Sequence, residues 1–331
     1  MRLRSGEEMD ISKLLASVGK EVQLEVFLTD VKENSGQTGM SWLELMVRDS
    51  TGFSTFKIWS EARERLAQAG IYPKELIGKP VSVTGMAELY QNKGEVNVMD
   101  ISPLQEGSYS LSNFFPAVTE NDKSYLKSRL EILIKQVKDE SLRSLLEYIF
   151  SNGRLEKMLN MCGGTTHHTY LGGLLAHLVQ TAESAFREAD CSVVGPYRQK
   201  VNTDIVIAGA LLHDVGKLTT LLEVPGKLSD RGFYVSHATE SILFVSGFNG
   251  KIAAEKRVKN LAPVIHVIES CHNGKARTQE AILVSQADKG SSRRDAFGLA
   301  FYDGSKLERG GTISYSKEMG GYLLKGGEEN E

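Results

Sequence analysis

His213 and Asp214 stand together at the end of a strongly apolar segment of the 331-residue chain. Ile205, Ala208 and Leu211 before them follow the three- and four-residue spacing of a buried helix. An ionised aspartate beside such a segment is costly unless a cation or a hydrogen-bonded partner neutralises it. Because adjacent helical residues point about 100° apart, both side chains can reach one ion only in a cleft between helices. The sequence therefore predicts a metal centre that several helices build.

Further histidines and an aspartate lie at the ends of other apolar segments. His177 sits at the edge of a leucine stripe, where a lone histidine is more often a core residue than a ligand. His237 begins one predicted helix, His272 ends another, and Asp288 ends the segment AILVSQAD. Nitrogen and oxygen ligands mixed in this way are typical of a first-row transition metal rather than of calcium.

Residues 123–300 must supply the helices that position these side chains. The segments KSYLKSRLEILIKQV and ESLRSLLEYIF show apolar spacing of three and four, and the pattern continues with breaks to about Asp288. We predict an all-α domain over this range. Residues 301–331 form a glycine-rich tail with an acidic end, in which we expect no chemistry and at most a short hairpin.

Residues 1–105 have the pattern of strands. Between Glu21 and Leu104, apolar residues alternate in five short runs that turn residues separate. The segment SEARERLAQAG, after the third run, begins with a capping serine and ends at a glycine, as helices do. Three strands, a helix and two strands match the order of an OB-fold barrel. Residues 106–122 are predicted to be a linker, in which Phe114 and Phe115 dock on a neighbouring surface.

The order of His177, the pair His213-Asp214 and Asp288 resembles the HD superfamily of metal-dependent phosphohydrolases. The segments HHTYLGGLLAHLVQ, GALLHDVGKL and IESCHNGKA are similar to those of the YhaM-type 3′-to-5′ exoribonucleases, which join an N-terminal OB-fold to an HD domain. The resemblance covers roughly residues 21–288. It implies a multidomain chain, with an all-β OB-fold barrel followed by an all-α HD-domain helical bundle.

The resemblance also implies a metal and its ligands. The ion is commonly manganese in this family, with iron, cobalt, nickel or magnesium as alternatives. His237 and His272 would serve a second metal or the scissile phosphate. Two-metal relatives usually have a histidine where this chain has Cys271, whose sulfur is soft and need not be ionised, so the choice between one and two ions stays open. The implied ligands of the first ion are His177, His213, Asp214 and Asp288.

Three residues are the expected catalytic groups. Asp214 is the first candidate to orient or deprotonate the attacking water, because a carboxylate can bridge a metal and a nucleophile. Lys217 would neutralise phosphate charge, and His237 would act on the scissile phosphate. In the same domain, we expect substrate contacts from His167, His168, Lys217 and Lys275.

The OB region is expected to decide the substrate class, because such barrels stack bases on exposed aromatic rings. The available rings are Trp42, Phe53, Phe56, Trp59 and Tyr90, some of which must belong to the core. Of these, Trp42, Phe56 and Trp59 are the predicted substrate contacts. Residues 1–105 nevertheless hold 12 Lys and Arg against 15 Asp and Glu, so this region is no basic platform for a polyanion. The expected partner is single-stranded nucleic acid, with RNA favoured, and a second copy of the chain is a further candidate.

Composition restricts where the protein works. The formal net charge of −3 gives no global attraction to nucleic acid or membranes. The three cysteines form no Cys-x-x-Cys pair, which argues against a disulfide framework and a thiolate zinc site. The N-terminal segment is charged where a secretory peptide is apolar, and no stretch resembles a membrane span. We expect a cytoplasmic protein with no membrane partner.

Three hypotheses follow. The favoured one is a metal-dependent 3′-to-5′ exonuclease on single-stranded RNA, with single-stranded DNA as an alternative substrate. The second is a phosphohydrolase of small nucleotides, in which the OB region is regulatory or an oligomer contact. The third is a non-catalytic OB-type nucleic-acid-binding protein, which the intact HDVGK motif argues against.

Overall fold

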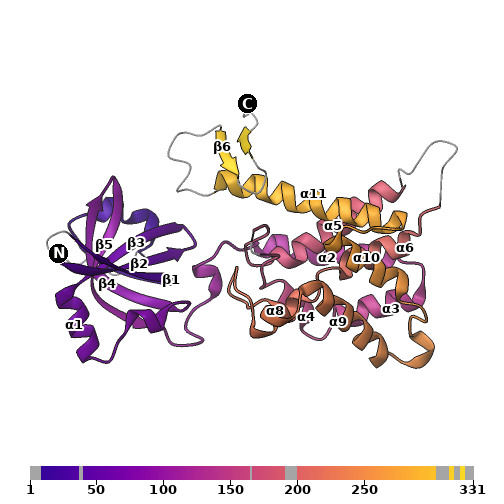
Figure 1. Cartoon of the computed structure of the whole chain (residues 1–331), viewed down its shortest axis with the longest axis horizontal. Helices are drawn as coiled ribbons and strands as arrows, with labels where there is room; N and C mark the ends of the chain where they lie inside the picture. Colours follow the sequence, from indigo (N-terminus) through magenta and orange to yellow (C-terminus); the bar gives the residue numbers. More distant parts are fainter. Residues whose placement is uncertain are drawn as a thin grey trace. The chain divides into compact units, whose positions relative to one another are not determined.

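The computed structural model describes residues 9–36, 40–164, 166–190, 200–302, 313–316 and 321–324. The chain divides between Pro116 and Ala117 into two compact units, a barrel and a helical unit (Figure 1). Each unit has its own hydrophobic core, and the two cores share no residue among those described. The predicted order, a barrel followed by helices, is confirmed.

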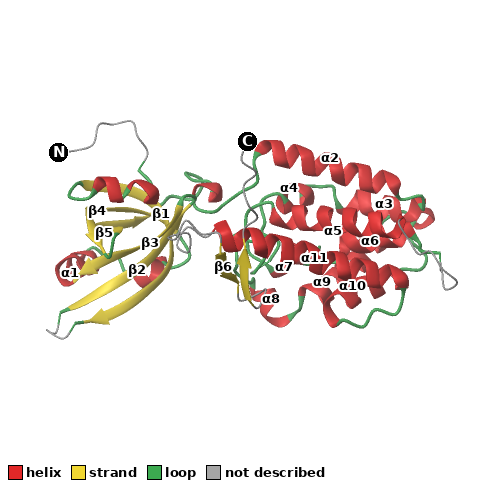
Figure 2. Ribbon diagram, turned by 90° about the horizontal axis from the view of Figure 1, so that it is seen from above, coloured by secondary structure: helices red, strands yellow, loops and turns green. Residues whose placement is uncertain are grey.

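Five strands close the barrel (Figure 2). They follow the order β1-β2-β3-β5-β4, with β1 also paired to β4, and the contact between β3 and β5 is parallel. The helix α1 (Ser60–Gln68) lies between β3 and β4 in the sequence, which is the predicted OB order. The strands are β1 (Glu21–Ser35), β2 (Ser41–Asp49), β3 (Gly52–Trp59), β4 (Pro80–Tyr90) and β5 (Lys93–Pro103).

The alternation of side chains along each strand decides which aromatic rings of the barrel point to the surface, where they could contact substrate. Strand β2 pairs with β3 so that Trp42 lies opposite Trp59 on the outer face, one position along the ladder from the buried pair of Leu43 and Ile58. Phe56 lies opposite Leu45, and both side chains are fully buried in the barrel core. The prediction that Phe56 contacts substrate is therefore wrong, because side chains one residue apart on a strand point to opposite faces.

The helical unit is built around one apolar helix. Every residue of α6 from Val206 to Leu212 is buried, and α5, α10 and α11 pack against it. A helix that is apolar all round belongs in the centre of a bundle. The helices are α2 (Glu120–Gln136), α3 (Glu140–Ile149), α4 (Arg154–Met158), α5 (Gly173–Asp190), α6 (Thr203–Leu212), α7 (Lys217–Thr220), α8 (Asp230–Tyr234), α9 (His237–Lys251), α10 (Ala262–Asn273) and α11 (Gln279–Tyr302).

The predicted linker is divided between the units. Phe114 and Phe115 are buried against Phe27, with ring centroids 6.3 and 4.9 Å away, so the predicted docking of these two rings is confirmed. Helix α2 begins inside the same segment, where Thr119 and Asp122 form a capping box.

The C-terminal part contains the predicted hairpin, formed by β6 (Ile313–Ser316) and β7 (Gly321–Leu324). The acidic end of the tail lies outside the described residues. Within the described helices, none has the length and apolar character needed to cross a membrane. Short 3-10 turns complete the chain at Ile11–Lys13, Leu15–Ser17, Pro73–Leu76, Leu111–Asn113 and Ala254–Lys256.

Candidate metal centre

Four side chains converge in the interior of the helical unit and form what we call the inner set: His177, His213, Asp214 and Asp288. His177 Nε2 lies 3.2 Å from His213 Nε2, 3.5 Å from Asp214 Oδ2 and 3.2 Å from Asp288 Oδ1. His213 Nε2 lies 3.4 Å from Asp214 Oδ2 and 3.8 Å from Asp288 Oδ1. Ligands bound at about 2.0–2.2 Å to one ion lie slightly more than 3 Å apart. The spacing therefore suits a single metal ion.

The central helix explains why these atoms meet. Helix α6 ends at Leu212, so His213 and Asp214 occupy the turn that follows it, with His213 still in helical conformation. His213 Nδ1 lies 2.8 Å from the Ala210 carbonyl, to which it donates, and this leaves Nε2 toward the inner set. His177 comes from α5 and Asp288 from α11, two of the helices that pack against α6.

A second group, which we call the outer set, shares Asp214 and adds His237 and His272. Asp214 Oδ1 lies 3.5 Å from His237 Nε2 and 3.6 Å from His272 Nε2. The two imidazole rings are 4.5 Å apart between centroids. Their side chains are 38% and 24% exposed, whereas the inner histidines are 0% exposed. The outer set is thus the side of the centre that substrate can reach.

The carboxylate of Asp214 provides the test of whether these residues suit a metal. It is buried, and its Oδ1 atom accepts no hydrogen bond from the residues that the structure describes. A buried, unsatisfied carboxylate oxygen that faces two imidazoles is costly unless a cation fills the space. The donors fit one divalent ion in the inner set, and Asp214 can share a second ion with the outer set.

Charge and burial set the protonation of the inner set. Burial lowers the pKa of His177 to about 4, so this ring is neutral. Burial also lowers the pKa of His213, but the charge and hydrogen bond of Asp214 have the larger effect and raise this pKa to about 9. Burial raises the pKa of the Asp214 carboxyl, but Lys217 and His213 have the larger effect and hold this pKa well below its usual range. Asp214 is therefore ionised and ready to bind a cation.

Lys217 is buried at the start of α7. Its Nζ lies 2.5 Å from Asp214 Oδ2 and also donates to the carbonyl of Gly163. The ammonium group has three protons, so two of its donors have partners inside the protein. The role of Lys217 in binding phosphate stays a prediction, and the structure adds a role as counterion of Asp214.

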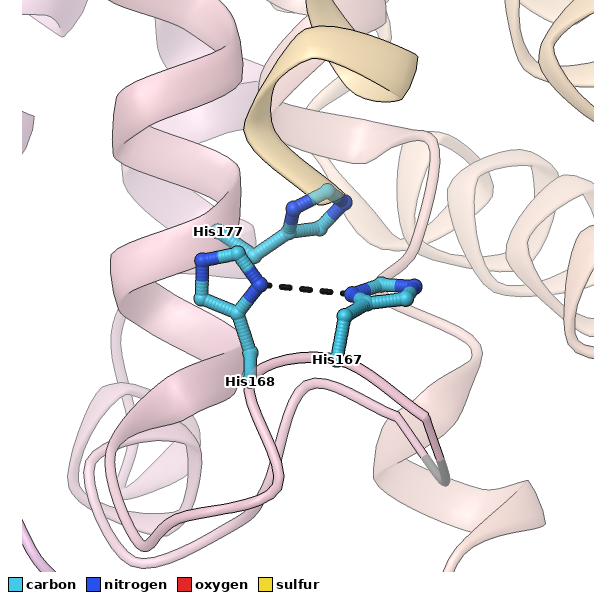
Figure 3. A group of neighbouring side chains, drawn as sticks. All are labelled: His167, His168 and His177. Carbon is cyan, nitrogen blue, oxygen red and sulfur yellow. Dashed lines mark hydrogen bonds between the residues drawn. The ribbon is translucent and has the colours of Figure 1, made fainter. Parts of the chain in front are cut away.

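His167 and His168 flank the inner set on the loop before α5 (Figure 3). The ring of His167 is half-buried and lies 5.2 Å from that of His177 between centroids. His168 is fully buried, with φ at 48°, and its backbone N–H donates to the carboxylate of Asp295. At Gly173, a Cβ would lie 2.3 Å from the His168 carbonyl, so glycine lets the loop pack on the first turn of α5. Burial makes His168 a support for its neighbour and leaves His167 as the candidate substrate contact.

The remaining predicted contacts lie at the surface. Lys275 is exposed, just after the end of α10 and three residues past His272. On the barrel, Trp59 is 37% exposed and its ring lies 5.5 Å from that of Trp42. Cys271 is buried in the helical core, and burial raises the pKa of its thiol, so it is protonated.

Sequence reasoning missed the groups that orient the ligands. Ser291 Oγ lies 3.2 Å from His177 Nδ1 and donates to Gln180 Oε1 at 3.1 Å. A signal for both was present, because each lies three residues after a ligand on the same helix: Gln180 after His177, and Ser291 after Asp288.

Comparison with known proteins places a known domain on this part of the chain. The HD domain family model matches residues 168–292. A Bacillus subtilis (strain 168) protein named 3'-5' exoribonuclease YhaM is 23% identical over 266 residues, which are 80% of this chain and 79% of that protein. A Geobacillus sp. (strain WCH70) protein of the same name is 24% identical over 213 residues, 64% of this chain. The chain spans 61% of the length of that Geobacillus relative.

Solved structures align with smaller parts of the chain. The second OB-fold domain of replication protein A from Methanococcus maripaludis aligns with a TM-score of 0.21 and 20% identity, over 28% of this chain and 91% of that one. Rim1, a mitochondrial single-stranded DNA binding protein from S. cerevisiae, aligns with a TM-score of 0.22 and 12% identity, over 27% of this chain and 97% of that one. The OB assignment of the barrel therefore rests on its own strand order.

Proposed function

Because the chain fits the YhaM type, with an HD domain behind an N-terminal OB barrel, we propose that it is a metal-dependent hydrolase that degrades single-stranded RNA from the 3′ end. Single-stranded DNA is the alternative polymer. The proposed ion is manganese, and the proposed place of action is the cytoplasm.

One observation carries the hydrolase proposal. Asp214 is a single buried carboxylate whose two oxygens face two different ligand sets, one closed and one open. Such a bridging carboxylate is typical of sites that activate water beside a phosphodiester. When bound, a divalent metal supplies acidified water and positive charge for the phosphoryl group.

The chain's own residues define the direction of approach. The inner histidines are fully buried, so the phosphodiester must come from the side of His237 and His272. Burial lowers the pKa of His237 to about 4, which makes it a ligand or an acceptor rather than a proton donor at neutral pH. Lys217 holds a positive charge next to Asp214 and has one donor left for a phosphate oxygen.

The barrel supports a single-stranded substrate. The outer faces of β2 and β3 carry aromatic rings at both ends of the ladder: Trp42 beside Trp59, and Phe53, which is 58% exposed. Between these ends, Lys57 lies opposite Glu44. Rings on this face of an OB barrel stack bases without regard to sequence, and each base contributes about 1–3 kcal/mol.

The 3′-to-5′ direction and the preference for RNA rest on the relatives, which are named for that activity. The decisive experiment incubates the protein and Mn²⁺ with single-stranded RNA labelled at the 5′ end. A ladder that shortens one nucleotide at a time is expected. Early release of labelled mononucleotide would show the opposite direction, and an intact strand would show that RNA is not a substrate.

A phosphohydrolase of small nucleotides is the second candidate, and the charge of the barrel region favours it. Residues 1–105 carry 12 Lys and Arg against 15 Asp and Glu, which is a poor electrostatic match to a long polyanion. Hydrolysis of free nucleotides combined with no activity on oligonucleotides would select this function.

A further inference from the structure

A chain of hydrogen bonds leads from the inner set to the histidine pair on the neighbouring loop. His177 Nδ1 lies 3.2 Å from Ser291 Oγ, and Ser291 Oγ lies 3.1 Å from Gln180 Oε1. The same Gln180 oxygen lies 3.2 Å from His168 Nε2, and His168 Nδ1 lies 3.2 Å from His167 Nδ1. Figure 3 shows this last contact beside His177. The chain of hydrogen bonds thus has two branches that meet at the carbonyl oxygen of Gln180. The first branch leads to Ser291 and His177, and the second leads to His168 and His167.

Metal ligation determines the direction of the first branch. His177 points Nε2 at the inner set, so a metal requires that nitrogen to be unprotonated and the ring proton to sit on Nδ1. Ser291 then accepts from Nδ1 and must donate its own proton onward. Only the carbonyl end of Gln180 can accept that proton, since the amide end carries donors alone.

The second branch depends only on the position of the Gln180 carbonyl oxygen. A carbonyl oxygen at 3.2 Å from His168 Nε2 requires the proton of this ring on Nε2. His168 Nδ1 is then an acceptor, and His167 must donate to it from its own Nδ1. His167 Nε2 is left unprotonated, and Figure 3 shows this nitrogen turned away from His168.

We propose that Gln180 is a positioning residue that fixes the tautomers of His177 and His168 with one carbonyl oxygen and so leaves His167 Nε2 as a hydrogen-bond acceptor. The proposal rests on the metal-dependent function above for its first branch only. The second branch holds whether or not the protein is a nuclease. A neutral acceptor at His167 suits a hydroxyl or amino group of a substrate and not a phosphate oxygen.

Histidine tautomers can be measured directly. Two-bond ¹⁵N–¹H correlation spectra of the metal-free protein distinguish protonated from unprotonated ring nitrogens, and single histidine substitutions assign the signals. We expect the proton on Nε2 of His168 and on Nδ1 of His167. Gln180→Met should remove this preference and give mixed tautomers at both rings. A wild-type His168 protonated on Nδ1 would overturn the proposal, whatever substrate the protein has.

Metal affinity tests the branch to His177. Loss of the partner that orients a metal-binding histidine typically lowers affinity 10- to 100-fold. We expect about that loss of Mn²⁺ affinity in Gln180→Met, by titration calorimetry, and affinity within about threefold of wild type in Gln180→Glu, whose carboxylate still accepts both bonds. Ser184→Ala is the matched control, because Ser184 lies one turn further along α5 and lines the same 370 Å³ cavity as Gln180.

The outcomes separate positioning from general support of the fold. Equal Mn²⁺ affinity in Gln180→Met and Ser184→Ala would contradict the proposal. If Gln180→Met does not fold, Gln180→Glu and the wild-type spectrum decide instead: a Gln180→Glu protein that folds but shows mixed His168 tautomers would also contradict it.

Discussion

Asp214 connects the two ligand sets and also neutralises a buried lysine, so its removal affects more than metal binding. The carboxylate receives Lys217 on one oxygen and faces His237 and His272 with the other. Hydrolysis and folding stability therefore depend on the same group, and a single substitution cannot separate them.

We expect Asp214→Ala to abolish hydrolysis, because it deletes the ligand shared by both sets. It should also lower the free energy of unfolding by about 3–5 kcal/mol, since it leaves the buried Lys217 ammonium without its counterion. Denaturant unfolding and turnover assays check both effects. The double variant Asp214→Ala/Lys217→Met should recover most of the stability and none of the activity. Recovered activity in either protein would contradict this role of Asp214.

His213 predicts how metal affinity depends on pH. Its pKa of about 9 in the metal-free protein means that a proton occupies Nε2 at pH 7, because Nδ1 already donates to Ala210. A metal must displace this proton, so apparent affinity should rise about tenfold per pH unit up to about pH 9 and then level off. Calorimetric titrations with Mn²⁺ at several pH values test the slope, and a flat profile would exclude a protonated His213.

The stability of the metal-free protein should fall as the pH rises, whereas the metal affinity should increase. A folded-state pKa raised from 6.5 to about 9 contributes stability that is complete below pH 6.5 and is lost as pH rises through 9. The melting temperature of metal-free protein should therefore fall over this range. Protein saturated with Mn²⁺ should not follow it, because metal replaces the proton on His213.

The candidate ligands could be singled out from the sequence, because apolar spacing put histidines and aspartates at the ends of predicted helices and the resemblance to the HD superfamily implied which of them share an ion. The structure brings these six side chains close together around Asp214. The prediction for Phe56 was wrong because the sequence shows only that an aromatic ring is present. The position of the residue along its strand decides whether the ring points into the core or to the surface. Gln180 and Ser291 each lie one turn after a candidate ligand, but the sequence does not show that they meet: the contact between them and that of Ser291 with His177 join residues more than 100 positions apart.

At the level of elements, Gly216 determines how closely α7 approaches α9. A Cβ at this position would lie 2.3 Å from the His237 carbonyl and 2.4 Å from the Ser241 nitrogen, both of which are backbone atoms. The Gly216 N–H also donates to Ser241 Oγ at 2.8 Å. Helix α9, which begins at His237, can therefore pack this closely only because residue 216 has no side chain.

Gly216→Ala should push the first turn of α9 away and cost about 1–3 kcal/mol of stability, as overpacking does. Metal binding at the outer set should weaken, while the inner set keeps its ligands. Gly247→Ala on the same helix is the control: no atom lies within 4 Å of its Cβ position, so it should raise stability by about 0.5–1 kcal/mol. Unfolding curves and metal stoichiometry measure both, and equal effects at the two glycines would refute the close approach.

At the level of the whole molecule, we expect the two units to have separate functions. Every predicted metal ligand lies in the helical unit, and the exposed rings of β2 and β3 lie in the barrel. Their cores share no residue among those described, so each unit can keep its fold without the other. Chemistry and capture of a long strand should therefore be separable.

Removal of residues 1–116 should leave hydrolysis of a small activated phosphodiester intact and raise KM for long strands at least tenfold. Base stacking contributes about 1–3 kcal/mol per base, and about 1.4 kcal/mol corresponds to a factor of ten. In the full chain, Trp59→Ala should raise KM for long strands and leave kcat unchanged. Unaltered KM in both proteins would favour the small-nucleotide hydrolase.

The parallel seam of the barrel has a consequence for how this unit folds. Strands β3 and β5 pair only at Phe56 with Val96 and at Lys57 with Asn97, while β1 pairs with β4 from Glu21 to Phe27. The seam has two residue pairs, whereas β1 and β4 share seven, so the seam is the shorter of the two ladders that close the cylinder and has the fewer backbone contacts to lose. We expect the cylinder to open at this seam before the β1–β4 ladder separates, and backbone amides that bond across the seam should then exchange with solvent before those of the rest of the barrel.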